Sequence, residues 1–117
     1  MKARDLKNIS VPIELGNRTF RMAFDFNALA ELEEVYGDID KALRAIKTGK
    51  GRLKAIRALI YAGIKPRYPK IRLIEVGELL TEIISNADKA DKLMEQIKKA
   101  IEIAFPEPSK EDIESGE

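Results

Sequence analysis

The chain contains no cysteine, no histidine and no tryptophan among its 117 residues. Without cysteine or histidine it can form no disulfide, offers no thiol nucleophile or imidazole base, and lacks the usual zinc ligands. It has no apolar run of 18 residues, and its first residues, MKARDLKN, lack the apolar core of a secretory signal. These absences predict a protein that works in the cytoplasm and has neither a membrane span nor a disulfide framework.

The residues that are present are those of a globular domain. Hydrophobic residues make up 44% of the chain and charged residues 35%, a composition that suits one domain of this length. We expect that domain to cover residues 9–105, after a flexible segment at 1–8. The segment 106–117, PEPSKEDIESGE, has five acidic residues and one large aliphatic residue, so we expect a disordered acidic tail.

Residues 9–24 predict a β-hairpin. The pair Gly16-Asn17 favours a primed two-residue turn, which fixes the pairing of the strands. The resulting pairs are Leu15 with Arg18, Ile13 with Phe20, Val11 with Met22, and Ile9 with Phe24. This register gathers the large apolar side chains on one face. The opposite face then receives Ser10, Pro12, Glu14, Thr19, Arg21 and Ala23, and Pro12, which has no N–H, indicates an edge strand.

The remainder of the domain reads as helix. A first helix should run from a cap at Asp25 or Asn27 to about Tyr36, with Gly37 as a left-handed C-cap. Further helices are predicted at about 39–48, 52–64, 74–85 and 87–105, with a proline-containing loop at 65–72. The apolar stripes of the third and fourth helices include Leu53, Ile56, Leu59, Ile60, Ile64, Val76, Leu79, Leu80, Ile83 and Ile84. The expected fold is α+β and mainly α, with an N-terminal β-hairpin packed on about four to five short helices.

Charge is segregated although the net charge is only +1. Residues 41–72 hold eleven Lys or Arg and no acid, whereas residues 25–40 hold six acids and no base. A basic stretch of this kind occurs in nucleic-acid-binding proteins, so a small DNA-binding regulator is the alternative function. The complementary acidic stretch favours protein contacts instead. The candidate partner-binding residues are Tyr68, Arg44, Lys47 and Arg57.

No pattern of catalytic, cofactor-binding or metal-binding residues emerges. Gly49-Lys50-Gly51 lacks the spacing of a Walker A loop and reads as a turn between helices. Glu31 and Glu34 share a helical face, but no second helix carries matching ligands, so we expect no metal site. The sequence therefore predicts a protein that is not an enzyme and needs no cofactor.

The order of these elements resembles the tail assembly chaperones of long-tailed bacteriophages and prophages. The resemblance covers residues 9–105 and includes the stretches FDFNALAELEEVYGDI, LKAIRALIYAGI, IEVGELL and a final IAF. Its most specific residues are Phe24, Asn27, Ala28, Leu29, Leu32, Glu33, Gly37, Leu59, Tyr61, Ala62, Gly63, Glu75, Val76 and Leu79. Many relatives have tryptophan where this chain has Tyr61, and none of these positions is catalytic in the family.

The resemblance implies a non-catalytic chaperone. Members of the family bind the tape measure protein, a long and largely helical molecule that sets tail length, and help tail tube subunits to assemble around it. The implied partners are thus the tape measure protein and the tail tube protein, with self-association as a further expectation. The implied location is the cytoplasm of the host bacterium, and the protein is not expected in the mature virion.

Overall fold

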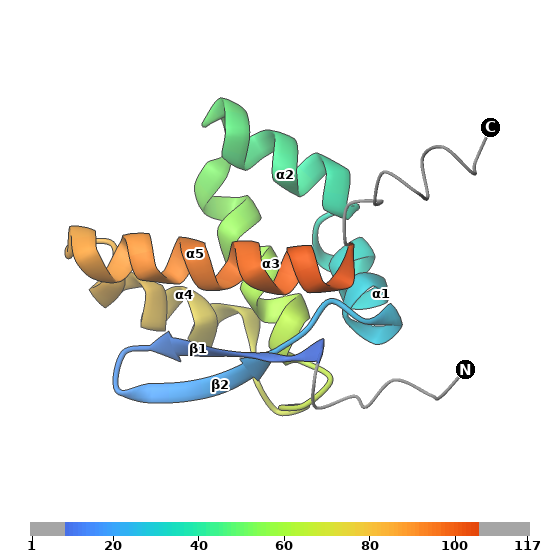
Figure 1. Cartoon of the computed structure of the whole chain (residues 1–117), viewed down its shortest axis with the longest axis horizontal. Coiled ribbons are helices and arrows are strands. Elements are labelled where there is room, and N and C mark those ends of the chain that lie inside the picture. Colours follow the sequence, from blue (N-terminus) through green and yellow to red (C-terminus); the bar gives the residue numbers. More distant parts are fainter. Residues whose placement is uncertain (1–8, 106–117) are drawn as a thin grey trace, which may run out of the picture.

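A two-stranded hairpin is followed by five helices along the chain. The computed structural model describes residues 9–105, so the segments predicted to be flexible, 1–8 and 106–117, lie outside the described residues. The elements are β1 (Val11–Leu15), β2 (Arg18–Met22), α1 (Phe26–Val35), α2 (Ile39–Thr48), α3 (Arg52–Ile64), α4 (Leu73–Ile83) and α5 (Ala87–Ala104). The hairpin lies at one end of the molecule, next to α4 and α5, and α2 lies at the opposite end (Figure 1). The predicted fold class is confirmed.

The hairpin has the predicted register. Three of the four predicted pairs are present in the antiparallel ladder, from Leu15 with Arg18 to Val11 with Met22. In the turn, Gly16 has a φ of 67° while Asn17 does not have a positive φ, which is the pattern of a type II′ turn. The fourth predicted pair, Ile9 with Phe24, is wrong, because the ladder ends at Met22 and the chain then turns away.

The two faces of the hairpin alternate as predicted within the strands. The inner face buries Val11, Ile13, Leu15, Phe20 and Met22, and the outer face exposes Pro12, Glu14, Thr19 and Arg21. Ser10 and Ala23 were predicted on the outer face but are buried, because they lie beyond the ends of the ladder. Both strands are edges of a two-stranded sheet, in agreement with the position of Pro12.

Helix α1 begins at an aspartate cap and ends before a glycine. The Ala28 N–H donates to Oδ1 of Asp25 at 3.0 Å, so Asp25 is the N-cap and Asn27 is an exposed residue of the first turn. The predicted left-handed cap at Gly37 is wrong in detail. Gly37 has a φ of 142°, outside the left-handed helical region, although its N–H still donates to the carbonyl of Leu32.

Helix α3 is the centre of the packing. Helices α1, α2 and α4 and strand β2 all pack on it, and every residue of its second half, from Ala58 to Ile64, is buried. Its buried positions include several small residues that allow close approach of its neighbours, namely Ala55, Ala58, Ala62 and Gly63. Of the residues that carry the resemblance, Phe24, Leu32, Leu59, Tyr61 and Val76 are buried in this core, and Leu29 and Leu79 are partly buried against it.

Two residues of the predicted apolar stripes are not buried. Leu53 in α3 is 69% exposed, and Ile84, which follows α4, is 62% exposed. The cause is the position of α5, which packs mainly on β1 and α4 and leaves the start of α3 uncovered.

Candidate functional site: an apolar groove

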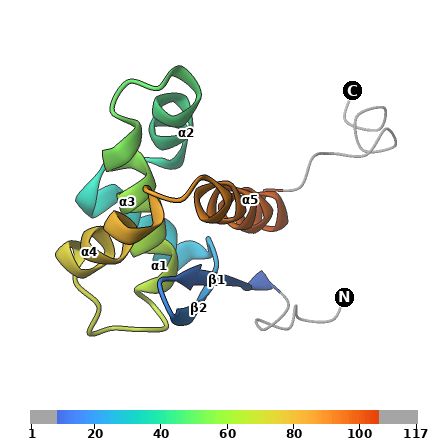
Figure 2. The same ribbon diagram turned by 90° about the vertical axis from the view of Figure 1, so that its left-hand side faces the viewer.

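An open groove of about 600 Å³ lies between α2, α3, α4 and α5. The arrangement is clearest in Figure 2, where α5 stands to one side of α2 and α3, and α4 lies below them. The groove has a floor of buried side chains, Leu80, Ile83 and Leu93, and walls of partly buried ones, Ile46, Ile56 and Met94. A hollow with this apolar lining is suited to bind an apolar surface of another molecule.

The rim of the groove combines exposed apolar residues with basic ones. Leu53 and Ile84 are exposed at its edges. Arg52, Lys54 and Arg57 come from the first half of α3, and among residues 9–105 no Asp or Glu lines the groove. The rim therefore has a positive potential beside an apolar floor.

These basic side chains have no carboxylate partner in the described part of the chain. The ion pairs found there join Arg67 with Asp25, Arg72 with Glu75, and Lys92 with Glu14, all of them outside the groove. Arg52 uses its Nε to donate to the carbonyl of Ile46 at 3.1 Å. Lys54 and Arg57 are left available for a negatively charged ligand.

The groove offers few polar groups that could orient a small substrate. The hydroxyl of Thr81 donates to the carbonyl of Gly77 at 2.9 Å, within its own helix. Across residues 9–105, no three Asp or Glu side chains are close enough to hold a metal ion. A site of this kind can bind an apolar surface.

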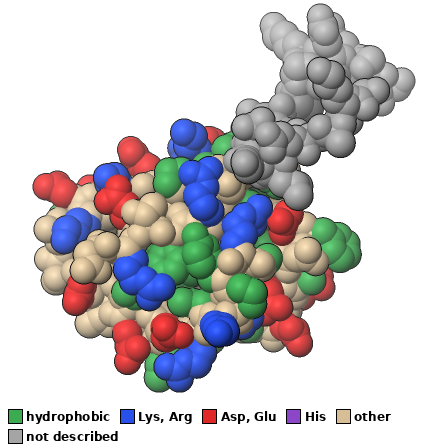
Figure 3. Space-filling model, turned by 90° about the horizontal axis from the view of Figure 1, so that it is seen from below, with side chains coloured by type: hydrophobic (Ala, Val, Ile, Leu, Met, Phe, Trp, Pro, Cys, Tyr) green, Lys and Arg blue, Asp and Glu red, His purple; other side chains and the backbone are tan. Residues whose placement is uncertain are grey.

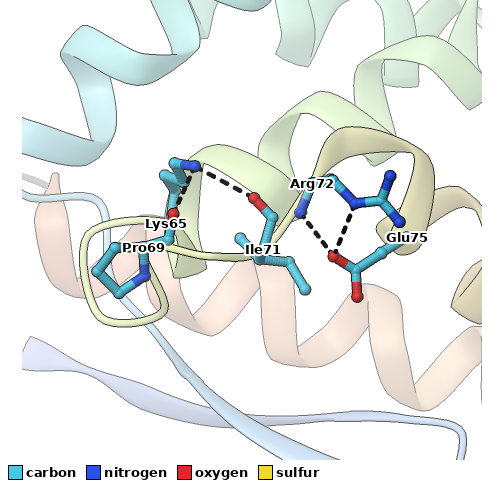
Figure 4. Close-up of polar contacts among 5 residues, drawn as sticks. All are labelled: Lys65, Pro69, Ile71, Arg72 and Glu75. Atoms are coloured by element: carbon cyan, nitrogen blue, oxygen red, sulfur yellow. Dashed lines mark hydrogen bonds and ion pairs between the residues drawn. The ribbon is translucent and has the colours of Figure 1, made fainter.

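The loop at 65–72 uses much of its basic charge inside the fold. Lys65 donates from Nζ to the carbonyls of Pro69 at 2.7 Å and Ile71 at 3.2 Å (Figure 4). Arg72 donates from its backbone N–H and from Nε to Oε1 of Glu75, at 3.1 and 3.4 Å. The eleven basic residues of 41–72 thus do not form one uniform binding surface.

Tyr68, a predicted partner contact, lies against the hairpin. The backbone N–H of Arg21 donates to its hydroxyl at 2.9 Å, and its ring meets Phe20 edge-to-face with centroids 4.9 Å apart. Tyr68 also borders a second, shallower hollow beside Arg18 and Lys70. These contacts give Tyr68 a role in the fold, and its role in partner binding stays a prediction.

The structure separates the other predicted partner contacts. Arg57 lines the groove, whereas Arg44 and Lys47 are exposed on α2 and do not line it. The residues predicted to contact a partner do not include Leu53, Ile84, Arg52 or Lys54. Alternating apolar and basic residues at the start of α3 were the available signal, but only the placement of α5 shows that they remain uncovered.

The face seen in Figure 3 is mixed in character. On the face seen in Figure 3, hydrophobic side chains gather near the centre, with basic and acidic side chains around them. None of the helices in the described ranges is long and apolar enough to cross a membrane.

No protein-family model matches the chain, and neither a curated protein nor a solved structure gives a significant match.

Proposed function

We propose that the protein is a non-catalytic tail assembly chaperone that binds the tape measure protein and assists tail tube assembly. The observation that carries this proposal is the open apolar groove between α2, α3, α4 and α5. The resemblance of residues 9–105 to this chaperone family names the client, and the groove supplies a place for it.

A groove of this kind fits the task of such a chaperone. A long helical client has apolar edges that stay exposed until its assembly partners cover them. Large exposed apolar surfaces promote aggregation. Grooves on small helical domains bind amphipathic helices by covering that apolar edge. Occupation of the groove would keep the tape measure protein dispersed in the host cytoplasm until tube subunits replace the chaperone.

The competing function is a small DNA-binding regulator. Its support is the run of eleven basic residues at 41–72. Against it, Lys65, Arg67 and Arg72 are bonded within the fold, and Arg52, Lys54 and Arg57 line one wall of an apolar hollow. A surface that follows a phosphate backbone would carry its cations beside polar groups, in a row open to solvent.

Co-expression with the tape measure protein of the same phage tests the proposal. The expected result is a soluble complex that copurifies through gel filtration, with the tape measure protein insoluble when expressed alone. A tape measure protein that is equally insoluble with and without this chain would contradict the proposal. A gel shift of duplex DNA with a steep salt dependence would favour the regulator instead. Absence from purified virions by mass spectrometry is a further expected result.

A further inference from the structure

We infer that the groove binds one amphipathic helix of a partner protein, and that Asp or Glu side chains flank the apolar edge of that helix. This inference rests on the proposed function for the identity of the partner, and it adds the site and the chemistry of the bound segment.

The shape and lining of the groove indicate a helix. Four helices surround the groove, and its apolar side chains lie both on the floor and on the exposed edges, at Leu53 and Ile84. A helix presents an apolar ridge at spacings of i, i+3 or i+4, and i+7, which is the shape that such a groove receives. A small molecule would need convergent polar groups, and the hydroxyl of Thr81 is already bonded to its own helix.

The charges of the rim select the flanks of that helix. Arg52, Lys54 and Arg57 line one wall, and no acidic residue of the described segment 9–105 offsets them within the groove. Lys54 and Arg57 form no ion pair in the part of the chain that the structure describes. A helix with acidic flanks would therefore gain favourable contacts and a faster association, whereas one with basic flanks would be repelled.

The acidic segments of this chain are poorer occupants. On the outer face of α1 the exposed positions include Phe26, Ala30 and Glu33, so the apolar ridge stops after one large side chain. In the segment 106–117 the only large aliphatic residue is Ile113. Neither segment supplies repeated large apolar residues to pack against the apolar lining of the groove, so a partner protein is the better occupant.

The test uses the full chain and designed helical peptides of about 20 residues, which are about 30 Å long as helices. The first peptide carries leucines at i, i+3, i+4 and i+7 with Glu on both flanks. A second has Lys in place of Glu, and a third has the same composition with the leucines scattered. Fluorescence anisotropy should show binding of the first peptide, about tenfold weaker binding of the second, and no saturable binding of the third.

Matched double variants locate the site. K54E with R57E reverses two cations at the groove, and R44E with K47E reverses two cations on α2 away from it. The groove variant should bind the Glu-flanked peptide more weakly, by about tenfold or more, and the Lys-flanked peptide more tightly. The α2 variant should change the affinity for either peptide by less than about twofold. L53S, at an exposed position, should also weaken binding of the Glu-flanked peptide. Thermal melts check that each variant is folded.

Other outcomes would overturn the inference. An equal loss of affinity for the Glu-flanked peptide in both double variants would mean a general charge effect. Displacement of that peptide by duplex DNA would mean that the groove is a nucleic-acid-binding surface. Self-association that only the groove variants abolish would make a second copy the occupant. Tighter peptide binding after deletion of residues 107–117 would make the chain's own acidic tail the occupant. If the unmodified chain and the groove variants bind the tape measure protein equally well, only this inference fails. If the chain binds the Glu-flanked peptide but not the tape measure protein, only the proposed function fails.

Discussion

Gly63 in α3 lies directly against Met22 at the end of β2. A Cβ atom at Gly63 would be 2.5 Å from Cγ of Met22 and 3.0 Å from its sulfur. The same glycine accepts a backbone hydrogen bond from the N–H of Ala23 at 3.1 Å. The hairpin and the central helix thus meet backbone to backbone, and this approach exists because position 63 has no side chain.

The first prediction compares two helical glycines. Gly63→Ala should destabilise the protein by about 1–3 kcal/mol, because Met22 is fully buried and cannot move aside freely. Gly77→Ala should stabilise it by up to about 1 kcal/mol, because alanine favours the helix and the new Cβ would meet Cδ of Arg57 at an ordinary 3.5 Å. Urea unfolding measures both, and a destabilised Gly77→Ala would contradict the placement of Arg57 over α4.

The second prediction concerns the buried face of α1. Leu32 is completely buried, so Leu32→Asp should leave a charge without a partner in the core and cost about 4 kcal/mol or more, enough to unfold most of the protein. Leu29 is only partly buried, and Leu29→Asp should cost less. Thermal unfolding followed by circular dichroism measures which variant loses more stability. Ala30→Gln on the exposed face is the control, and a loss there equal to that of Leu32→Asp would point to helix propensity instead of burial.

The third prediction separates two roles of Asp25. Its Oδ1 accepts the N–H of Ala28, and its Oδ2 lies 3.6 Å from Nη1 of Arg67, a buried nitrogen that has no hydrogen bond. Asp25→Ala should lose both interactions and cost about 1–2 kcal/mol. Asp25→Asn should keep the cap, lose the ion pair and cost less. Denaturant unfolding at low and high salt tests this order; equal losses for the two variants would mean that the cap contributes nothing.

The fourth prediction distinguishes the structural role of Tyr68 from a partner contact. Tyr68→Phe removes only the acceptor for the exposed N–H of Arg21 and should cost less than about 1 kcal/mol. Tyr68→Ala also removes the edge-to-face contact with Phe20 and should cost more than Tyr68→Phe. Melting temperatures measure stability, and binding of the tape measure protein is measured in parallel. A stable Tyr68→Phe variant with impaired binding would support the predicted partner role.

Much of the local structure could be read from the sequence. The turn residues Gly16 and Asn17 and the alternation of Ile13 with Glu14 fix the hairpin register, because a slip of one residue would turn every apolar side chain to the wrong face. Asp25 marks a helix start because its side chain accepts an orphan N–H group of the first turn, and the structure shows the same kind of cap at Asp38 and Asn86. The absence of cysteine and histidine is likewise a property of the sequence alone.

Burial at the groove could not be read in the same way. Leu53 and Ile84 lie on apolar stripes yet are exposed, while Ala55 and Ala58, in the same helix as Leu53, are buried. A stripe shows which face of a helix is apolar, but which part of it is covered depends on where the other helices pack. Here α5 packs on β1 and α4 and leaves the start of α3 open. The sequence by itself determined the elements and their apolar faces. The tertiary structure decided that one apolar face stays uncovered beside Lys54 and Arg57, because the packing of helices depends on contacts between segments that are distant in the sequence.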